Sequence, residues 1–332
     1  MMRLHLLPTY LFLCLKILIA LFSSGAFAAE ANDHVQENKK MALVLSLVWN
    51  GDHIFPHNLE ALSQLRQTYP DLRFWHFISP NYFLATSDEE RERRASLIQK
   101  HIKEKDFVGL YLEARPNIIE ESGVLFRARP SFFRGSTVQC ESLENCQYDA
   151  MLSVFSQKEL RKIIRTSKSI IEAQGFHIGD RFMNRFWEGD SHITQAALDL
   201  GFREDYSAIP PSLLFRRLAQ VPGFPWIEAN WKRLEQRGGQ PYWRKFPEGR
   251  ILVVPQSAGA IDYLTPREFM ENFSRTAALF EADKNNILVF HMTIHQETAA
   301  MYLPKLNKVL QALEQGTKEK QLSIQFHLPS YL

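Results

Sequence analysis

Short apolar runs alternate with amphipathic stretches along most of this chain. The runs at 42–48, 73–78 and 107–112 have the length and the β-branched or aromatic content of buried strands. The segments 58–69 and 88–105 between them carry apolar residues at helical spacing. Strands and helices in this order favour parallel strands joined by crossover helices.

The same alternation continues in the second half, where helix starts are explicit. Ser156–Glu159 and Thr265–Glu268 match the capping box, the second with Pro266 at the first helical position. Further strands are predicted at 181–186, 251–254, 287–290 and 322–326, and further helices at 157–174, 191–200, 265–282 and 298–314. About seven βα units without a Gly/Ser linker predict one α/β barrel domain rather than two domains.

Two long stretches interrupt the alternation. They cover residues 114–153 and 206–250, and the second is rich in Pro, Gly and Trp. Connections of this length are usually functional or disordered, and their aromatic content favours order. We expect the two stretches to frame a cleft.

The N-terminus has the pattern of a secretory signal. An apolar run at 11–22 precedes Ala26-Phe27-Ala28, the small-x-small pattern of a cleavage site. A retained anchor is the alternative, but Lys16 interrupts the run and leaves it short for a bilayer core that needs about 20 apolar residues. We expect a periplasmic or secreted protein with no transmembrane segment in its mature chain.

The predicted boundaries follow from this pattern. Residues 1–28 form the signal peptide, 29–40 a polar, flexible leader, and 41–332 the barrel domain. Cys140 and Cys146 remain in the mature chain, and an oxidising compartment favours a disulfide between them. Free thiols and a zinc site are the alternatives, and zinc would need two more ligands at suitable spacing.

The charge of the chain argues against one class of function, the binding of nucleic acid. The 332 residues carry a net charge of +2, with acidic and basic residues interspersed. A nucleic-acid-binding protein would concentrate basic residues on one face. We therefore expect no binding to nucleic acid.

In a parallel α/β barrel the functional groups lie where the strands end at their carboxyl side. Asp52, Glu113, His291 and His295 fall at or just after such ends. Carboxylates and imidazoles there suit a metal that polarises water, or a general acid/base pair. The alternatives are an N-cap role for Asp52, an ion pair of Glu113 with Arg115, and a core position for His291.

The strand ends also carry the motifs of a known family. These motifs are Trp49-Asn50-Gly51, Phe74-Trp75-His76-Phe77, Gly201-Phe202-Arg203 with Asp205-Tyr206-Ser207-Ala208, Gln240-Pro241-Tyr242, Asp262-Tyr263 and His295-Gln296-Glu297-Thr298-Ala299. In order and spacing they resemble the divergent bacterial branch of the polysaccharide deacetylases. The resemblance spans nearly the whole mature chain. It implies a distorted (β/α) barrel and metal-dependent removal of acetyl groups from N-acetylated sugars.

The positions at which this chain differs from the family are those that would hold the metal and line the site. Asn50 replaces a carboxylate, and Tyr111 and Glu113 stand where the family has a histidine pair. The family's Arg-Ala-Gly-Gly-Trp stretch reads Met183-Asn184-Arg185-Phe186-Trp187, which fills space that glycines leave open. The usual zinc cage is therefore absent, and access to the site is expected to be narrowed.

Candidate residues follow from the strand ends and the resemblance together. Asp52 and His295 are the catalytic candidates, and with Glu113 they form an oxygen-rich candidate metal site, with zinc the metal of the resembled family. The aromatic candidates for glycan binding are Trp49, Trp187, Trp226, Trp231, Tyr242 and Trp243. Three functions stay open: a degenerate barrel that binds N-acetylated glycans, a deacetylase with an altered metal site, and a periplasmic scaffold.

Overall fold

The computed structural model describes residues 39–51, 53–84, 86–134, 150–281, 287–326 and 328. Lys39–Leu332 form one structural unit. The predicted signal peptide, most of the leader, Asp52, Cys140 and Cys146 lie outside the described residues. The cleavage site and the disulfide therefore stay predictions.

A mostly parallel sheet forms the centre of the unit. Its strands are β1 (Lys40–Trp49), β2 (Phe74–Ile78), β3 (Phe107–Leu112), β4 (Arg181–Asn184), β5 (Glu204–Asp205), β6 (Tyr242–Phe246), β7 (Gly249–Val253), β8 (Gly259–Ala260), β9 (Ile287–His295) and β10 (Ser323–Gln325). Their order is β6-β7-β5-β4-β3-β2-β1-β9-β8, with β10 pairing beside β1. All of these pairs are parallel except β6 with β7.

One segment connects the β6–β7 hairpin, at one edge of the sheet, with β8 at the other edge. In β7, Leu252 pairs with Glu204 of β5, while a few residues later Gly259 of β8 pairs with Met292 of β9. The chain from β7 to β8 therefore runs from one edge of the strand order to the other, which brings the two edges of the sheet close together. The predicted distorted (β/α) barrel is confirmed in this form, as a curled, mostly parallel sheet.

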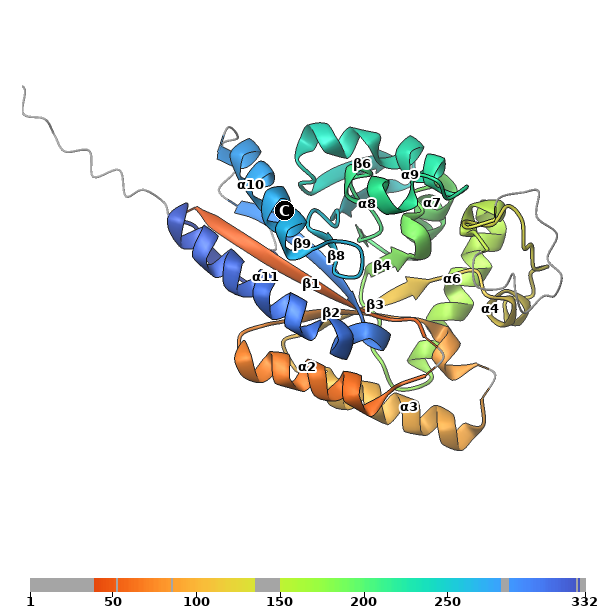
Figure 1. The fold of residues 1–332 in the computed structure, drawn as a ribbon. Coiled ribbons are helices and arrows are strands. Elements are labelled where there is room, and N and C mark those ends of the chain that lie inside the picture. Colours follow the sequence, from red (N-terminus) through yellow and green to blue (C-terminus); the bar gives the residue numbers. More distant parts are fainter. Residues whose placement is uncertain are drawn as a thin grey trace, which may run out of the picture. The chain divides into compact units, whose positions relative to one another are not determined.

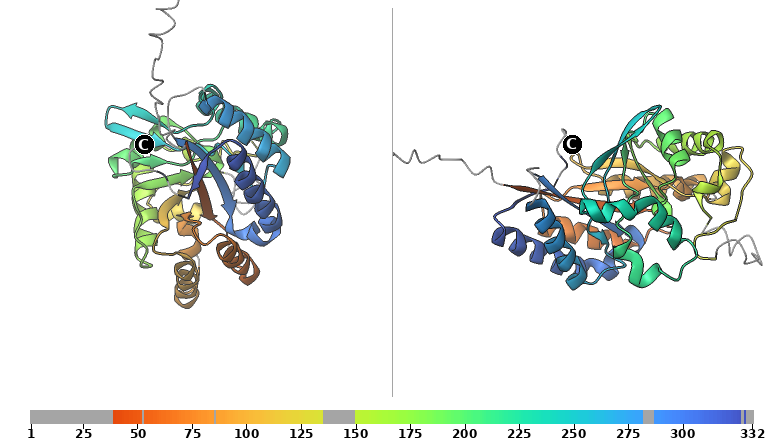
Figure 2. Two further views of the ribbon diagram at one scale, coloured as in Figure 1. Left: turned by 90° about the vertical axis from the view of Figure 1, so that its left-hand side faces the viewer. Right: turned by 90° about the horizontal axis from the view of Figure 1, so that it is seen from above.

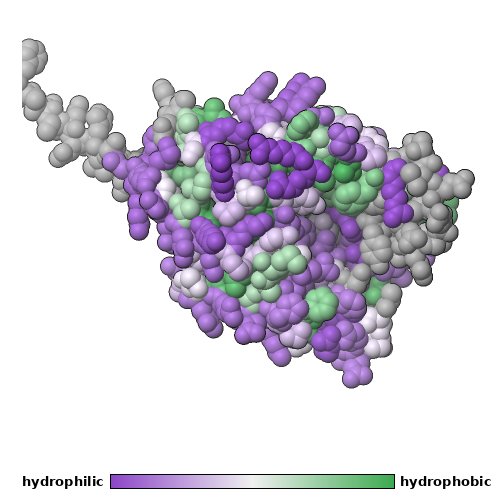
Figure 3. All heavy atoms as spheres, in the orientation of Figure 1, coloured by the Kyte–Doolittle hydropathy of each residue, from purple (hydrophilic) through white to green (hydrophobic). Residues whose placement is uncertain are grey.

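Helices cover the outer face of the curled sheet (Figures 1 and 2). They are α2 (Pro56–Thr68), α3 (Asp88–His101), α4 (Pro116–Glu121), α6 (Gln157–Glu172), α7 (Ser191–Asp199), α8 (Ser212–Leu218), α9 (Phe224–Trp231), α10 (Pro266–Glu281) and α11 (Ala299–Glu319). Within the described part of the chain, no helix is long and apolar enough to span a bilayer. The face in Figure 3 is mostly polar, with small separate apolar areas.

Strand side chains alternate between two cores. On β1, Met41, Leu43 and Leu45 join the large cluster under the helices, whereas Ala42 and Val44 join a second cluster inside the curl of the sheet. This period of two follows from the pleat of a strand. Side chains at the carboxyl end of the inner series therefore reach the mouth of the barrel.

Most predicted elements are present. The strand at 107–112 has the predicted bounds, and Ser156 caps α6 through the predicted capping box with Glu159. β4 ends at Asn184, earlier than expected, because Arg185–Trp187 form a 3₁₀ turn. The stretch at 206–250 is not a loop but holds α8, α9 and β6.

Candidate functional site

A cavity of about 170 Å³ lies at the carboxyl ends of the strands. Its lining includes Asn50 after β1, Tyr111 of β3, Asn184 of β4, and Thr293 and His295 of β9. The inner series of β9 reaches this mouth at Thr293 and His295, two and four positions after His291. We call this space the mouth cavity.

Three oxygen atoms in the lining lack hydrogen-bond partners among the described residues. They are Oδ1 of Asn50, Oδ1 of Asn184 and Oγ1 of Thr293. Leaving a buried polar group unpaired costs about 1–3 kcal/mol, so native proteins rarely retain it without a reason. The residues that carry these three buried atoms all line the mouth cavity.

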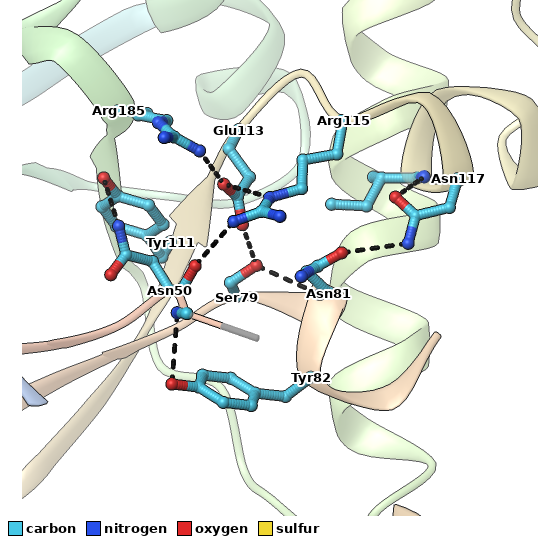
Figure 4. A network of polar contacts seen from close by, with 11 residues as sticks. Asn50, Ser79, Asn81, Tyr82, Tyr111, Glu113, Arg115, Asn117 and Arg185 are labelled. Carbon is cyan, nitrogen blue, oxygen red and sulfur yellow. Dashed lines mark hydrogen bonds and ion pairs between the residues drawn. The ribbon is translucent and has the colours of Figure 1, made fainter. Parts of the chain in front are cut away.

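Beside this cavity, Glu113 is held in a buried polar network (Figure 4). Its Oε1 accepts a hydrogen bond from Ser79, and its Oε2 accepts from Arg115 at 2.9 Å and from Arg185 at 2.7 Å. Burial acts to raise the pKa of this carboxyl, but the two guanidinium groups and Ser79 hold it below its ordinary value. Glu113 is therefore ionised, and both of its carboxylate oxygens accept hydrogen bonds from side chains of the protein.

The network continues across the strand ends. Arg115 also donates to the backbone oxygen of Asn50 at 2.9 Å, and the Asn50 amide lies 3.5 Å from the Tyr111 hydroxyl. Burial raises the pKa of the Tyr111 phenol, which therefore stays protonated and neutral. The two positions that the resemblance assigns to histidines thus hold a neutral phenol and an ion-paired carboxylate.

The described residues do not fit the zinc site of the resembled family. Across 39–51, 53–84, 86–134, 150–281, 287–326 and 328, no group of three or more His, Cys, Asp or Glu residues is placed to hold a metal ion. Both oxygens of Glu113 are already bonded within the protein, and Asp52 lies outside this set. The described residues of the site therefore provide hydrogen-bonding and acid/base groups but not the ligand set of a zinc ion.

His295 is oriented by a carboxylate. Its Nδ1 donates to Oδ2 of Asp262 at 2.7 Å, and Thr298 donates to the other Asp262 oxygen at 3.2 Å. This bond leaves Nε2 as the ring nitrogen available to a ligand in the mouth cavity. An imidazole fixed in this way can accept or donate a proton. The sequence motifs include both residues, but only His295 was predicted to be a site residue, although Asp262 lies two positions after the end of β8, which pairs with β9.

His291 does not line the mouth cavity. It is buried in the barrel interior, where Nδ1 lies 3.2 Å from the backbone oxygen of Val254 and Nε2 lies 2.7 Å from Oγ of Ser46. Burial lowers its pKa to about 4. His291 is thus the core histidine that the sequence left open, and its expected position on the cavity rim is corrected.

A strained turn forms one wall of the mouth cavity. Phe186 and Trp187 have φ values of 55° and 54°, in the left-handed region that disfavours side chains. Trp187 donates from Nε1 to Gln256 at 3.0 Å, and its backbone oxygen accepts from Trp231 at 2.6 Å. These bonds fix the turn, so that the side chains of Phe186 and Trp187 line the mouth cavity. The resemblance predicted bulky side chains at these positions, where the family has glycines.

The aromatic candidates divide by position. Trp49 is fully buried in the cluster under the helices and donates to His76 at 3.0 Å, and Trp231 is buried and donates to the backbone oxygen of Trp187. Both are part of the scaffold. Tyr242 and Trp243 lie on the antiparallel hairpin of β6 and β7 and line neither the mouth cavity nor the cavity beside it.

Trp226 lines that neighbouring cavity, which measures about 480 Å³. The first long stretch contributes residues of Arg127–Phe132 together with Met151 and Ser153, and the second contributes residues of Gly223–Asn230. The prediction that these stretches frame a cleft is confirmed. We call this space the insertion cavity.

No family model and no curated protein matches this chain. Solved structures do. A family 4 carbohydrate esterase from Streptomyces lividans, in complex with acetate, has 11% identity and a TM-score of 0.41, over 85% of this chain and 91% of the other. A candidate polysaccharide deacetylase from Mycobacterium smegmatis has 11% identity and a TM-score of 0.44, over 89% and 96%.

A pseudoenzyme of carbohydrate esterase family 4 from Bacillus anthracis is similar in the same degree. It has 10% identity and a TM-score of 0.42, over 88% of this chain and 71% of the other.

Proposed function

We propose that this protein binds an N-acetylated glycan in the mouth cavity and does not hydrolyse it with a metal. The observation that carries the proposal is the set of unpartnered oxygens of Asn50, Asn184 and Thr293. The Asn oxygens accept hydrogen bonds, and the Thr hydroxyl donates and accepts. Sugar hydroxyls and an acetamido N–H supply the complementary groups.

The charged groups beside the cavity support the same proposal. Arg185 lines the mouth cavity while one of its nitrogens bonds to Glu113. A guanidinium carries five N–H donors, so donors remain for a carbonyl oxygen of the ligand. A fixed cation of this kind binds a polar group without activating a water molecule as a metal does.

Hydrolysis is the second candidate function, and one observation favours it. The pair of His295 and Asp262 has the form of an oriented acid/base group at the cavity. Metal-dependent hydrolysis would need the altered metal site predicted from the sequence, in which Asp52 and Glu113 are ligands. The bonds of Glu113 to Ser79, Arg115 and Arg185 weigh against that arrangement.

Export is also proposed. The apolar run at 11–22 and the Ala26-Phe27-Ala28 pattern support a cleaved signal. A glycan of the cell envelope would then be in the same compartment as this protein.

Thr293→Val tests the binding proposal sharply. Valine has the shape of threonine but lacks the hydroxyl, which has no partner in the described structure. We expect unchanged or higher stability, together with about tenfold weaker binding of N-acetylglucosamine oligomers in calorimetric titrations.

Thr317→Val is the matched control. The Thr317 hydroxyl is also buried, but it donates to Leu313 within α11 at 2.8 Å. This variant should bind sugar as the unmodified protein does. If the unmodified protein binds no sugar at millimolar concentration, the proposed function is wrong.

A further inference from the structure

The hairpin of β6 and β7 gathers basic and aromatic residues at one edge of the sheet. β6 is the edge strand of the order, and Tyr242–Phe246 holds three aromatic residues and two cations. Neither Tyr242 nor Trp243 lines the mouth cavity or the insertion cavity, so the proposed glycan site leaves this hairpin without a role. The surrounding stretch at 206–250 carries eight Lys and Arg residues against three Glu residues, whereas the whole chain has a net charge of only +2. Positive charge is therefore concentrated in this part of the chain.

Two cations face each other across the hairpin. Lys245 of β6 pairs with Arg250 of β7 in the register of the two strands, and both side chains are exposed. Like charges directly opposite each other destabilise an antiparallel pair. Glu248 lies in the turn between the strands, and in the described structure it forms no ion pair with either cation. An anionic partner would turn this repulsion into attraction.

Arginines also stack on the aromatic rings of β6. Each of its three rings has a guanidinium over it: Arg250 over Trp243 at 4.2 Å, Arg237 over Tyr242 at 4.8 Å and Arg244 over Phe246 at 4.8 Å. Among the described residues, neither Arg237 nor Arg250 forms an ion pair with a carboxylate. The arginines of α3, by contrast, pair with acidic residues of the same helix. The hairpin therefore differs from an ordinary surface of mixed charge, where cations find partners within the protein.

Trp243 adds an apolar side chain to this basic surface. It is 39% exposed, and the alternation along β6 places it on the same face of the hairpin as Lys245 and Arg250. An indole beside exposed cations suits the surface of a bilayer, because the ring lies at the level of the headgroups while Lys and Arg reach anionic groups. A soluble acidic polymer would pair with the cations but would give the ring no apolar surroundings.

We propose that the β6–β7 hairpin docks on a bilayer surface that contains anionic phospholipid. The lipid phosphates pair with Lys245 and Arg250, and the ring of Trp243 enters the headgroup region. Each basic residue near such a surface strengthens binding by about fivefold, so a few cations give reversible docking. The proposed export would place the protein beside a surface of this kind. Strand pairing assembles this basic face, which the interspersed charges of the sequence do not show.

Co-sedimentation with lipid vesicles tests this inference. Vesicles of phosphatidylglycerol and phosphatidylcholine in equal parts should bind the exported protein, and vesicles of phosphatidylcholine alone should not. Lys245→Gln combined with Arg250→Gln should weaken binding by about tenfold or more, because two cations are lost. Trp243→Ala should weaken it severalfold although the cations remain. Salt at about 1 M should release the unmodified protein, because it shortens the range of charge interactions to about 3 Å.

The matched control is Lys100→Gln combined with Lys105→Gln. Both lysines are exposed, at the end of α3 and just before β3, and in Figure 1 α3 lies at the bottom whereas β6 lies at the top. This variant loses the same charge but should bind vesicles as the unmodified protein does, and circular dichroism should show all variants folded.

Two results would overturn the docking surface. One is the absence of binding to the anionic vesicles, and the other is equal weakening by the hairpin substitutions and by the control substitutions. Binding to soluble polyglutamate without binding to the vesicles would assign the hairpin to an acidic polymer instead of a bilayer.

Discussion

Arg185 donates a hydrogen bond to the buried carboxylate of Glu113 at 2.7 Å, across 72 positions of the sequence. Arg185 follows β4 and Glu113 follows β3, so parallel pairing of these strands brings the two charges together. The bond also anchors the strained turn that separates the two cavities. A position expected to hold a metal ligand thereby becomes part of an ion-paired scaffold.

We predict that Glu113→Ala destabilises the protein by about 3 kcal/mol or more, because it removes the buried carboxylate that accepts from both Arg115 and Arg185. Urea denaturation measures this loss. The control is Glu90→Ala, since Glu90 on α3 also pairs with two arginines, Arg93 and Arg94, but at the surface. Pairs of that kind contribute little, so the control should be close to unmodified. If Glu113→Ala lowered the free energy of unfolding only slightly, Glu113 would not have a structural role.

We predict that the purified protein retains no stoichiometric zinc and releases no acetate from N-acetylated oligosaccharides. A catalytic zinc is held by three protein ligands, usually with imidazoles among them, and here Tyr111 is neutral and Glu113 is ion-paired. Elemental analysis and acetate assays check this, with Asp52→Ala and His295→Ala for comparison. Stoichiometric zinc, with acetate release that either substitution abolishes, would establish the altered-site enzyme instead.

The sequence predicted regular elements well because their signals are local. Apolar runs identified β1 and β3, and a capping box located the start of α6. The turn after β4 was not predictable in this way. Its left-handed residues are held by bonds to Gln256 and Trp231, which lie 69 and 44 positions away.

In the candidate site, too, the sequence predicted what depends on local signals and missed what depends on distant contacts. The rule that sites lie at strand ends selected Glu113 and His295, but it gave no information on their partners. The sequence neighbour Arg115 was identifiable, whereas Arg185 and Asp262 reach the site only through strand pairing. The rule also placed His291 at the rim, because the strand was predicted to end at residue 290, whereas β9 continues to His295.

We predict that the mature protein begins at Ala29. Signal peptidase recognises small residues at the positions that Ala26 and Ala28 occupy. N-terminal sequencing of protein recovered from the cell envelope fraction checks this. Replacing Ala28 with a bulky residue (Ala28→Leu) should block cleavage and leave the longer chain. An intact Met1 on the unmodified, membrane-bound protein would show a retained anchor.

Glu188 gives the protein a predicted dependence of stability on pH. Its side chain borders the insertion cavity, and its oxygens accept backbone hydrogen bonds from Leu152 and Ser153, each at 2.8 Å. Burial raises its pKa to about 7, although these two bonds act in the opposite direction. In the unfolded chain a glutamate titrates near its ordinary value of about 4.3.

Between these two values the folded protein binds more protons at Glu188 than the unfolded chain does. The contribution of Glu188 to stability is therefore fully present below about pH 4.3 and is lost as the pH rises through about 7. Urea denaturation from pH 5 to 8 should show Glu188→Gln gaining stability relative to the unmodified protein as the pH rises. Glu228→Gln, which removes an exposed carboxylate from α9, should follow the unmodified protein throughout. A constant difference between Glu188→Gln and the unmodified protein would show that Glu188 titrates alike in both states.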